Sequence, residues 1–127
     1  MTEKNIVALP FISADKVEDE IRRIAKESTI NIVKLDHAID RMAEREITDR
    51  QILNVLRLGE RASEIKWNTD KERGWKCKFR RIVAATNVTV ATKLVKRDET
   101  TCLIITVFFK RCAICINILH VVWTIFI

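Results

Sequence analysis

Apolar side chains in the first part of the chain recur every three or four residues, which is the period of an amphipathic helix. The first such set predicts a helix at about residues 15–28, and its members are Val17, Ile21, Ile24 and Ala25. Asp15 and Glu18 have the spacing of a capping box at its start. After this helix, Ile30, Ile32 and Val33 are interpreted as a short extended connection.

Two shorter helices are predicted next. The second is predicted at about residues 36–46, with Asp36 as its N-cap. Its apolar stripe consists of Ala38, Ile39, Met42 and Ala43. The third begins with the capping box Thr48 and Gln51 and ends at Gly59. Its expected buried face consists of Ile52, Leu53, Val55 and Leu56.

Beyond Gly59 the apolar period changes to two, which is typical of half-buried strands. Strands are predicted at about residues 61–67, 75–80, 88–94 and 102–109, joined by polar turns. Because the last is almost wholly apolar, we expect it to be central. N-terminal helices followed by an antiparallel meander of about four strands indicate an α+β fold.

The pattern divides the chain into a lead-in and helix at 1–29, an α+β domain at 30–110 and an apolar tail at 111–127. Within residues 112–127, 13 of 16 side chains are apolar. Packing on the domain or in a homodimer, membrane anchoring and a divergent end all remain open. A helix of this length spans about 24 Å, short of a hydrocarbon core of about 30 Å, so packing is favoured over a membrane anchor.

The charge is unevenly distributed. The net charge is +6, but residues 1–65 carry 11 basic and 13 acidic side chains, whereas residues 66–111 carry 12 basic and 4 acidic ones. Such a basic segment favours a polyanionic partner, either nucleic acid or an acidic membrane surface. A surface that serves solubility alone explains the same imbalance.

Part of this positive charge forms a regular row. Lys76, Lys78 and Arg80 (the basic row) alternate with Trp75, Cys77 and Phe79, so they project from one side of their strand. Cations about 7 Å apart can follow a sugar–phosphate backbone, which favours RNA binding. The alternative is an ordinary polar outer face of a half-buried strand.

No basic stretch followed by an apolar run opens the sequence, so we expect no signal peptide. The four cysteines are then expected to be reduced, in a cytoplasmic protein.

The second helix carries a possible reactive group. His37, Arg41 and Arg45 (the His-Arg row) are spaced by four residues, so they lie along one side of the helix. In the first turn, backbone N–H groups favour an anion near His37. Imidazole can transfer a proton near neutral pH, and guanidinium groups can stabilise a phosphorane. Salt bridges on a solvated face, such as Arg41 with Glu44, explain the same residues.

A longer motif carries a family resemblance. His37-x₃-Arg41-Met42-x₂-Arg45-x-Ile47-Thr48 is followed by Ile52-Leu53-x-Val55-Leu56-x₂-Gly59. This resembles the opening of the domain of unknown function 4258 family, and Ile104-Ile105-Thr106-Val107-Phe108 resembles its closing strand. Glu46 stands where the family usually has glycine.

That family is similar to the barnase, EndoU, colicin and RelE-type ribonucleases, which are small and metal-independent. The resemblance implies a RelE/barnase-like fold and a toxin that cleaves RNA by attack of the 2′-hydroxyl on phosphate, with no cofactor. By position, the resemblance assigns catalytic roles to His37, Arg41, Arg45 and Thr106. It also implies RNA and an acidic antitoxin as partners. The rival interpretation is a degenerate toxin that binds nucleic acid or protein without catalysis.

Overall fold

The computed structural model describes residues 13–83 and 86–111. The N-terminal lead-in before Ser13 and the apolar tail after Arg111 lie outside these residues, as do the expectations about them. The described helices and strands are, in order, α1 (Ala14–Glu27), the 3₁₀ turn η2 (Thr29–Asn31), β1 (Ile32–Lys34), α2 (Asp36–Arg45), α3 (Asp49–Leu58), β2 (Glu60–Arg61), β3 (Lys66–Asn68), β4 (Gly74–Val83), β5 (Thr86–Lys96) and β6 (Thr100–Arg111). The α+β class is therefore confirmed.

The described strands form one mixed sheet in the order β1-β6-β5-β4-β2, with β3 also paired to β4. The six strands exceed the expected number of about four, and the expectation of a purely antiparallel meander was wrong. β1 pairs parallel to β6, with Ile32 opposite Cys102. The predicted extended connection is thus a strand, too short for its periodicity to be recognised.

The predicted strand at residues 61–67 is divided into β2 and β3, which pair with different parts of β4. The intervening chain stays attached to β4, since the Lys78 N–H donates to Ser63 Oγ at 3.0 Å and the Ala62 N–H donates to the Lys78 carbonyl at 2.8 Å.

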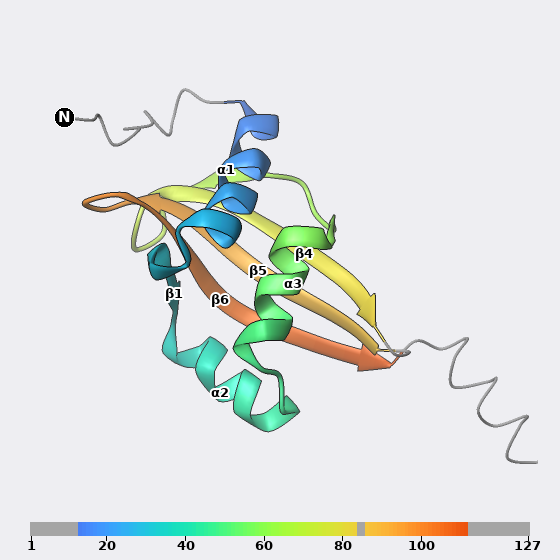
Figure 1. Cartoon of the computed structure of the whole chain (residues 1–127). Helices are drawn as coiled ribbons and strands as arrows, with labels where there is room; N and C mark the ends of the chain where they lie inside the picture. Colours follow the sequence, from blue (N-terminus) through green and yellow to red (C-terminus); the bar gives the residue numbers. More distant parts are fainter. Residues whose placement is uncertain (1–12, 84–85, 112–127) are drawn as a thin grey trace, which may run out of the picture.

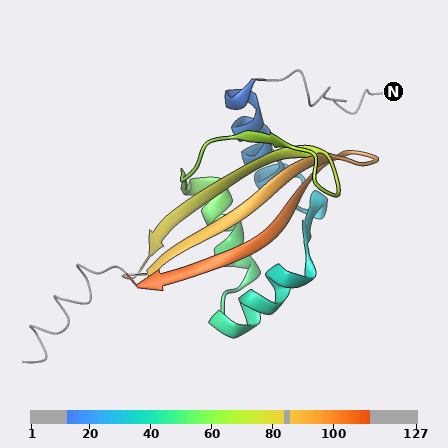
Figure 2. The ribbon, with the colours of Figure 1, turned by 180° about the vertical axis from the view of Figure 1, so that it is seen from behind.

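The helices cover only one side of this sheet. α1 and α3 lie across one face (Figure 1). From behind, β4, β5 and β6 have no helix in front of them (Figure 2). α2 follows β1 at one edge of the sheet and packs against β6. We call the face without helices the open face.

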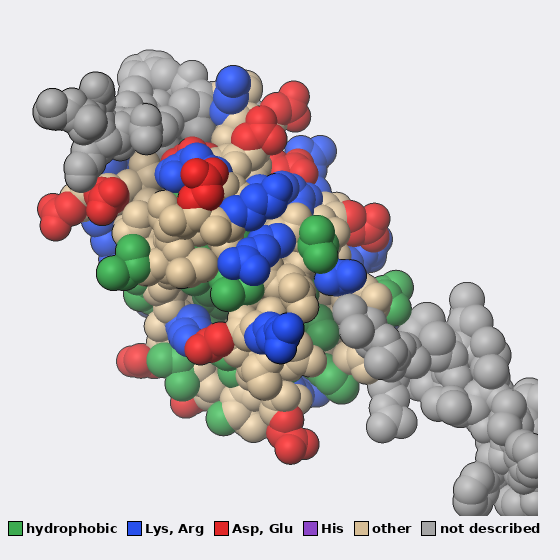
Figure 3. Space-filling model, in the orientation of Figure 1, with side chains coloured by type: hydrophobic (Ala, Val, Ile, Leu, Met, Phe, Trp, Pro, Cys, Tyr) green, Lys and Arg blue, Asp and Glu red, His purple; other side chains and the backbone are tan. Residues whose placement is uncertain are grey.

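The core fills the space between α1, α3 and the covered face. Side chains from both helices meet a cross-strand row formed by Phe79, Val90 and Val107, all of which are buried. Acidic and basic side chains are interspersed over the outer side of this layer (Figure 3). None of the helices in the described ranges has both the length and the apolar character needed to span a membrane.

Helix ends agree only partly with the sequence-based predictions. The capping box of Thr48 and Gln51 is present, and Gly59 is the C-cap of α3. A Cβ at Gly59 would lie 2.6 Å from the Arg80 carbonyl oxygen, so only glycine fits where α3 meets β4. The N-cap of α1 is Ser13 rather than Asp15, because the Ser13 side chain accepts from the Lys16 N–H. That of α2 is Leu35 rather than Asp36.

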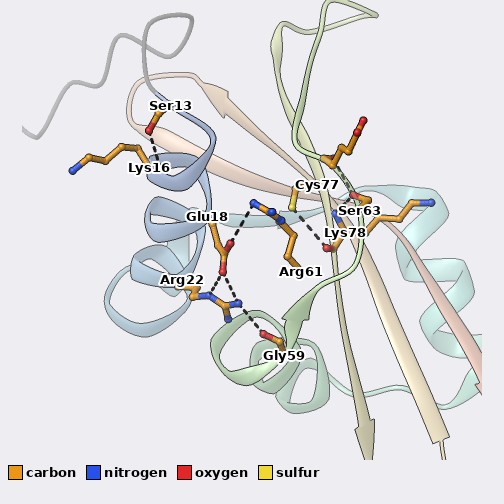
Figure 4. A network of polar contacts seen from close by, with 10 residues as sticks. Ser13, Lys16, Glu18, Arg22, Gly59, Arg61, Ser63, Cys77 and Lys78 are labelled. Atoms are coloured by element: carbon orange, nitrogen blue, oxygen red, sulfur yellow. Dashed lines mark hydrogen bonds and ion pairs between the residues drawn. The ribbon is translucent and has the colours of Figure 1, made fainter.

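Arg22 ties α1 to the end of α3. Its guanidinium donates to the carbonyl oxygens of Leu56 and Arg57, both at 3.1 Å, and of Gly59 at 2.8 Å. It also pairs with Glu18 at 2.9 Å, and Glu18 lies 3.8 Å from Arg61 (Figure 4). Because carbonyls at a helix C-terminus lack partners within the helix, Arg22 acts as a cap supplied by a neighbouring helix.

Candidate nucleic-acid interface

The basic row lies on the open face. Lys76, Lys78 and Arg80 are exposed, whereas Cys77 and Phe79 are buried beneath the helices, so the predicted orientation is confirmed. Arg80 donates to Glu60 at 2.9 Å, and Lys78 Nζ lies 5.3 Å from the centroid of the Phe108 ring. The two lysines therefore have more of their charge available to a ligand than Arg80.

Thr106 shares this face. Thr106 pairs with Ala91, and Ala91 pairs with Lys78, so the three residues form one row across β6, β5 and β4. With strands about 4.8 Å apart, Thr106 stands about 10 Å from Lys78 across the small side chain of Ala91. The structure thus places Thr106, one of the four predicted catalytic residues, on the same face as the basic row.

Phe108 is an open-face residue that the sequence did not indicate. It is 48% exposed, although it belongs to a strand expected to be buried. The β5–β6 register shifts after the Ala91–Thr106 pair, because Thr92 pairs with Ile104 and Ile105 has no partner of its own. This bulge turns Thr106 and Phe108 toward the open face, whereas strict alternation from Cys102 would place them in the core.

Two hollows adjoin on the open face. The first has a volume of about 420 Å³ and is bordered by Ser63, Trp67, Lys78 and Ala91. The second has a volume of about 400 Å³ and is bordered by Leu35, Lys93, Leu103 and Ile105, among others. Asn68 and Lys76 border both hollows, so Lys76 connects the basic row with the second hollow.

Lys93 is a buried cation in the wall of the second hollow. Its side chain lies on the open face, opposite Lys76 and Leu103, yet the residue is only 6% exposed. Its ammonium donates to Asn68 Oδ1 and to the Asp70 carbonyl, both at 2.9 Å. Burial, reinforced by the charge of Lys76, lowers the pKa of Lys93. No sequence pattern singled out Lys93, since its burial depends on the turn that folds against the sheet.

The His-Arg row lies on α2. His37 and Arg45 are exposed, and Arg41 is partly exposed with its guanidinium 3.5 Å from Glu44. The surface salt bridge of Arg41 with Glu44, predicted from the sequence as the alternative to a reactive site, is therefore present. Within the described ranges, no hydrogen bond or ion pair joins this row to the basic row.

The start of α2 nevertheless reaches the open face. Leu35, its N-cap, borders the second hollow and makes no side-chain cap, and its N–H donates to the Ile104 carbonyl at 3.0 Å. His37 follows two residues later, in the first turn as predicted. The predicted apolar stripe of α2 is only half correct, since Ala38 and Met42 are buried but Ile39, at 48%, and Ala43 are exposed.

Among the described residues, no three His, Cys, Asp or Glu side chains lie close enough together to hold a metal ion.

The model of a family defined by a domain of unknown function (DUF4258) matches residues 35–109. This match runs from the N-cap of α2 into β6 and covers more than half of the chain, so the protein belongs to that family. The family assignment made from the sequence is therefore confirmed. No match was found among curated proteins or solved structures.

Proposed function

We propose that this protein binds unpaired RNA on its open face and cleaves it as a metal-independent ribonuclease of the toxin type. The observation that carries the proposal is that Lys76, Lys78 and Thr106 share a sheet face without helices. Basic and aromatic groups on such a face suit unpaired RNA, because the bases can stack while the phosphates contact cations. The proposal includes kinship with the barnase, EndoU, colicin and RelE-type ribonucleases and a RelE/barnase-like arrangement of the fold.

The proposed reaction needs no component beyond RNA and the protein. The 2′-oxygen attacks the adjacent phosphorus as its proton passes to a base, and the bond from phosphorus to the 5′-oxygen breaks as that oxygen receives a proton. The products are a 2′,3′-cyclic phosphate and a 5′-hydroxyl. His37 is assigned one of the two proton transfers, because imidazole exchanges protons near neutral pH.

The arginines of α2 are assigned to the phosphate. Charge on the non-bridging oxygens increases toward the phosphorane, and guanidinium groups offer paired N–H donors to such oxygens. The pair of Arg41 with Glu44 is on the surface at 3.5 Å, so replacing the carboxylate with a phosphate costs little. Thr106 is assigned to hold a phosphate oxygen, and the basic row to bind flanking phosphates.

The proposal extends to partners and location. An acidic antitoxin protein would cover the basic open face and block RNA from it. A cytoplasmic location and a homodimer formed through the apolar tail belong to the same proposal.

The decisive experiment is cleavage of a labelled, unpaired oligoribonucleotide by the purified full-length protein in EDTA. Wild type is expected to cleave, and His37→Ala is expected to lose about 100-fold or more in rate. Arg45→Ala is expected to lose activity as well. Arg50→Ala removes another exposed arginine, at the start of α3, and is the matched control. Equal cleavage by wild type and His37→Ala would remove His37 from the mechanism.

A second candidate function is RNA binding without catalysis. The pairing of Arg41 with Glu44, and the lack of a direct polar contact between the His-Arg row and the basic row in the described ranges, favour it. This candidate predicts that Lys78→Gln weakens RNA binding while wild type releases no cyclic phosphate product. Product formation that depends on His37 would exclude it.

A further inference from the structure

We propose that the second hollow of the open face is a subsite for one unpaired nucleotide of the RNA. Its base would lie against Leu35, Leu103 and Ile105, and its phosphate would contact Lys76 and Lys93. This inference rests on the proposed RNA function and adds the element that would give it base preference.

The shape of the hollow suits a flat, largely apolar ring. Its volume is about 400 Å³, within the range of small-molecule sites. Leu35 and Ile105 are partly buried and Leu103 is buried, so the floor is aliphatic and already formed. The faces of a nucleobase are apolar and its edges are polar, which matches an aliphatic floor with polar walls.

The walls provide both charges and hydrogen-bonding groups. Two of the three N–H donors of Lys93 are used within the described chain, which leaves one for a phosphate oxygen. Lys76 is exposed and stands directly opposite Lys93 in the β4–β5 register. Because Lys93 is 6% exposed and held by two hydrogen bonds, its charge is fixed before a ligand arrives.

Two carboxylates in the same wall could accept from N–H groups on the edge of a base. Asp70 accepts from the Asn68 side-chain amide at 3.3 Å, and Glu72 accepts from Arg97. Since both lie on the turn between β3 and β4, this turn would determine which base edge is accepted.

The position of the hollow links the subsite to the proposed chemistry. Leu35 precedes His37 by two residues, so a nucleotide in this hollow would lie beside the first turn of α2. Lys76 also borders the first hollow, which continues toward Lys78. A bound nucleotide would therefore fix which phosphate of the strand reaches His37 and which phosphates reach the basic row.

The test compares four probes with the full-length protein by isothermal titration: uridine 5′-monophosphate, adenosine 5′-monophosphate, ribose 5-phosphate and inorganic phosphate. At least one nucleoside monophosphate is expected to bind about fivefold or more tightly than ribose 5-phosphate, because only it has a base to bury. Ile105→Ser, which makes the floor polar, should abolish that advantage. Ile82→Ser alters an exposed isoleucine that does not border the hollow and is the matched control. Lys93→Met should weaken the binding of all four probes, because each contains a phosphate.

A second arm separates a nucleotide within RNA from a free nucleotide. Ile105→Ser should also weaken binding of an unpaired hexaribonucleotide by about fivefold, whereas Ile82→Ser should not. If Ile105→Ser weakens the binding of free nucleotides but not of the hexaribonucleotide, the RNA subsite is wrong and the hollow binds free nucleotides instead.

The subsite and the proposed ribonuclease fail in different ways. If RNA is cleaved with dependence on His37 while neither nucleotide binds more tightly than ribose 5-phosphate, the subsite is wrong and the ribonuclease stands. If the nucleotides and the hexaribonucleotide bind with dependence on Ile105 while no RNA is cleaved, the subsite stands and the ribonuclease fails.

Discussion

Arg97 and Glu72 form a paired hydrogen bond across the rim of the open face. Arg97 Nε donates to Glu72 Oε2 and Arg97 Nη2 donates to Oε1, both at 3.0 Å. Arg97 lies in the turn between β5 and β6, and Glu72 in the turn between β3 and β4. The pair therefore holds two separate turns together where they enclose the second hollow.

This pair should make stability depend on pH in the acid range. Chiefly through its hydrogen bonds with Arg97, Glu72 has a pKa below its usual value of 4.5. A lowered pKa in the folded state means that the stabilisation is present above pH 4.5 and is lost as the pH falls through the lowered value. We expect Glu72→Gln to cost about 0.5 kcal/mol at neutral pH.

The measurement is urea unfolding of wild type and Glu72→Gln as the pH is lowered. The difference in unfolding free energy should narrow below pH 4.5 and then vanish. Glu64→Gln, from a more exposed pair with Lys66 at 3.4 Å, is the control and should cost less at neutral pH. A difference that stays constant into strong acid would contradict the role given to Arg97.

Removing Arg22 should destabilise the contact between α1 and α3. Arg22→Ala leaves the carbonyl oxygens of Leu56, Arg57 and Gly59 without this donor. It also removes the guanidinium 5.1 Å from the centroid of the Phe79 ring. We expect a loss of about 2–3 kcal/mol in the free energy of unfolding, measured with urea.

Arg23 provides the control for this prediction. It lies on the same helix, and in the part of the chain that the structure describes its side chain donates hydrogen bonds only to Glu20, at 3.0 and 2.6 Å. Arg23→Ala is therefore expected to cost about 0.5 kcal/mol. Equal losses for the two variants would mean that the carbonyl contacts of Arg22 contribute little.

The two core cysteines should be chemically inert in the folded protein. Burial raises the pKa of Cys77 to about 11 and that of Cys102 to about 12. At pH 8 only about one Cys77 thiol in a thousand is then the reactive thiolate. Alkylation with iodoacetamide followed by peptide mass spectrometry should label both residues in urea and neither in buffer. Rapid labelling in buffer would show that the core opens readily.

Neutralising one lysine of the basic row should reduce the salt dependence of RNA binding. Each phosphate contact to a single strand contributes about 0.7 to the slope of log affinity against log salt, so Lys78→Gln should lower the slope by about 0.7. Lys16→Gln, which removes an exposed lysine from α1, should leave it unchanged. Fluorescence anisotropy of a labelled unpaired oligoribonucleotide measures the slope. An unchanged slope for Lys78→Gln would mean that the RNA phosphates do not contact Lys78.

The basic row could be predicted from the sequence because β4 is regular there. Lys76, Lys78 and Arg80 alternate strictly with core residues, and alternation alone determines which side of a strand a residue faces. The capping box of Thr48 and Gln51 could be predicted for a similar reason, since it depends on residues three apart.

Features that depend on distant parts of the chain could not be predicted in this way. Thr106 was carried over from the family resemblance, and its place on the open face depends on the bulge at Ile105. Lys93 is buried only because the turn after β3 returns to the sheet. Ile39 is exposed because α2 packs at the edge of the sheet, where only one side of the helix contacts β6.

The parallel pairing of β1 with β6 affects the order in which the candidate site can be assembled. Residues 32–34 pair with residues 102–104, about 70 positions later in the chain. α2 follows β1 directly and packs against β6, so His37 cannot take its place until the last strand of the sheet has been synthesised. A nascent chain that ends before Thr100 would carry every residue of the His-Arg row and of the basic row, yet it would lack the strand that holds them together. The proposed ribonuclease activity would therefore begin only when translation of the domain is nearly complete.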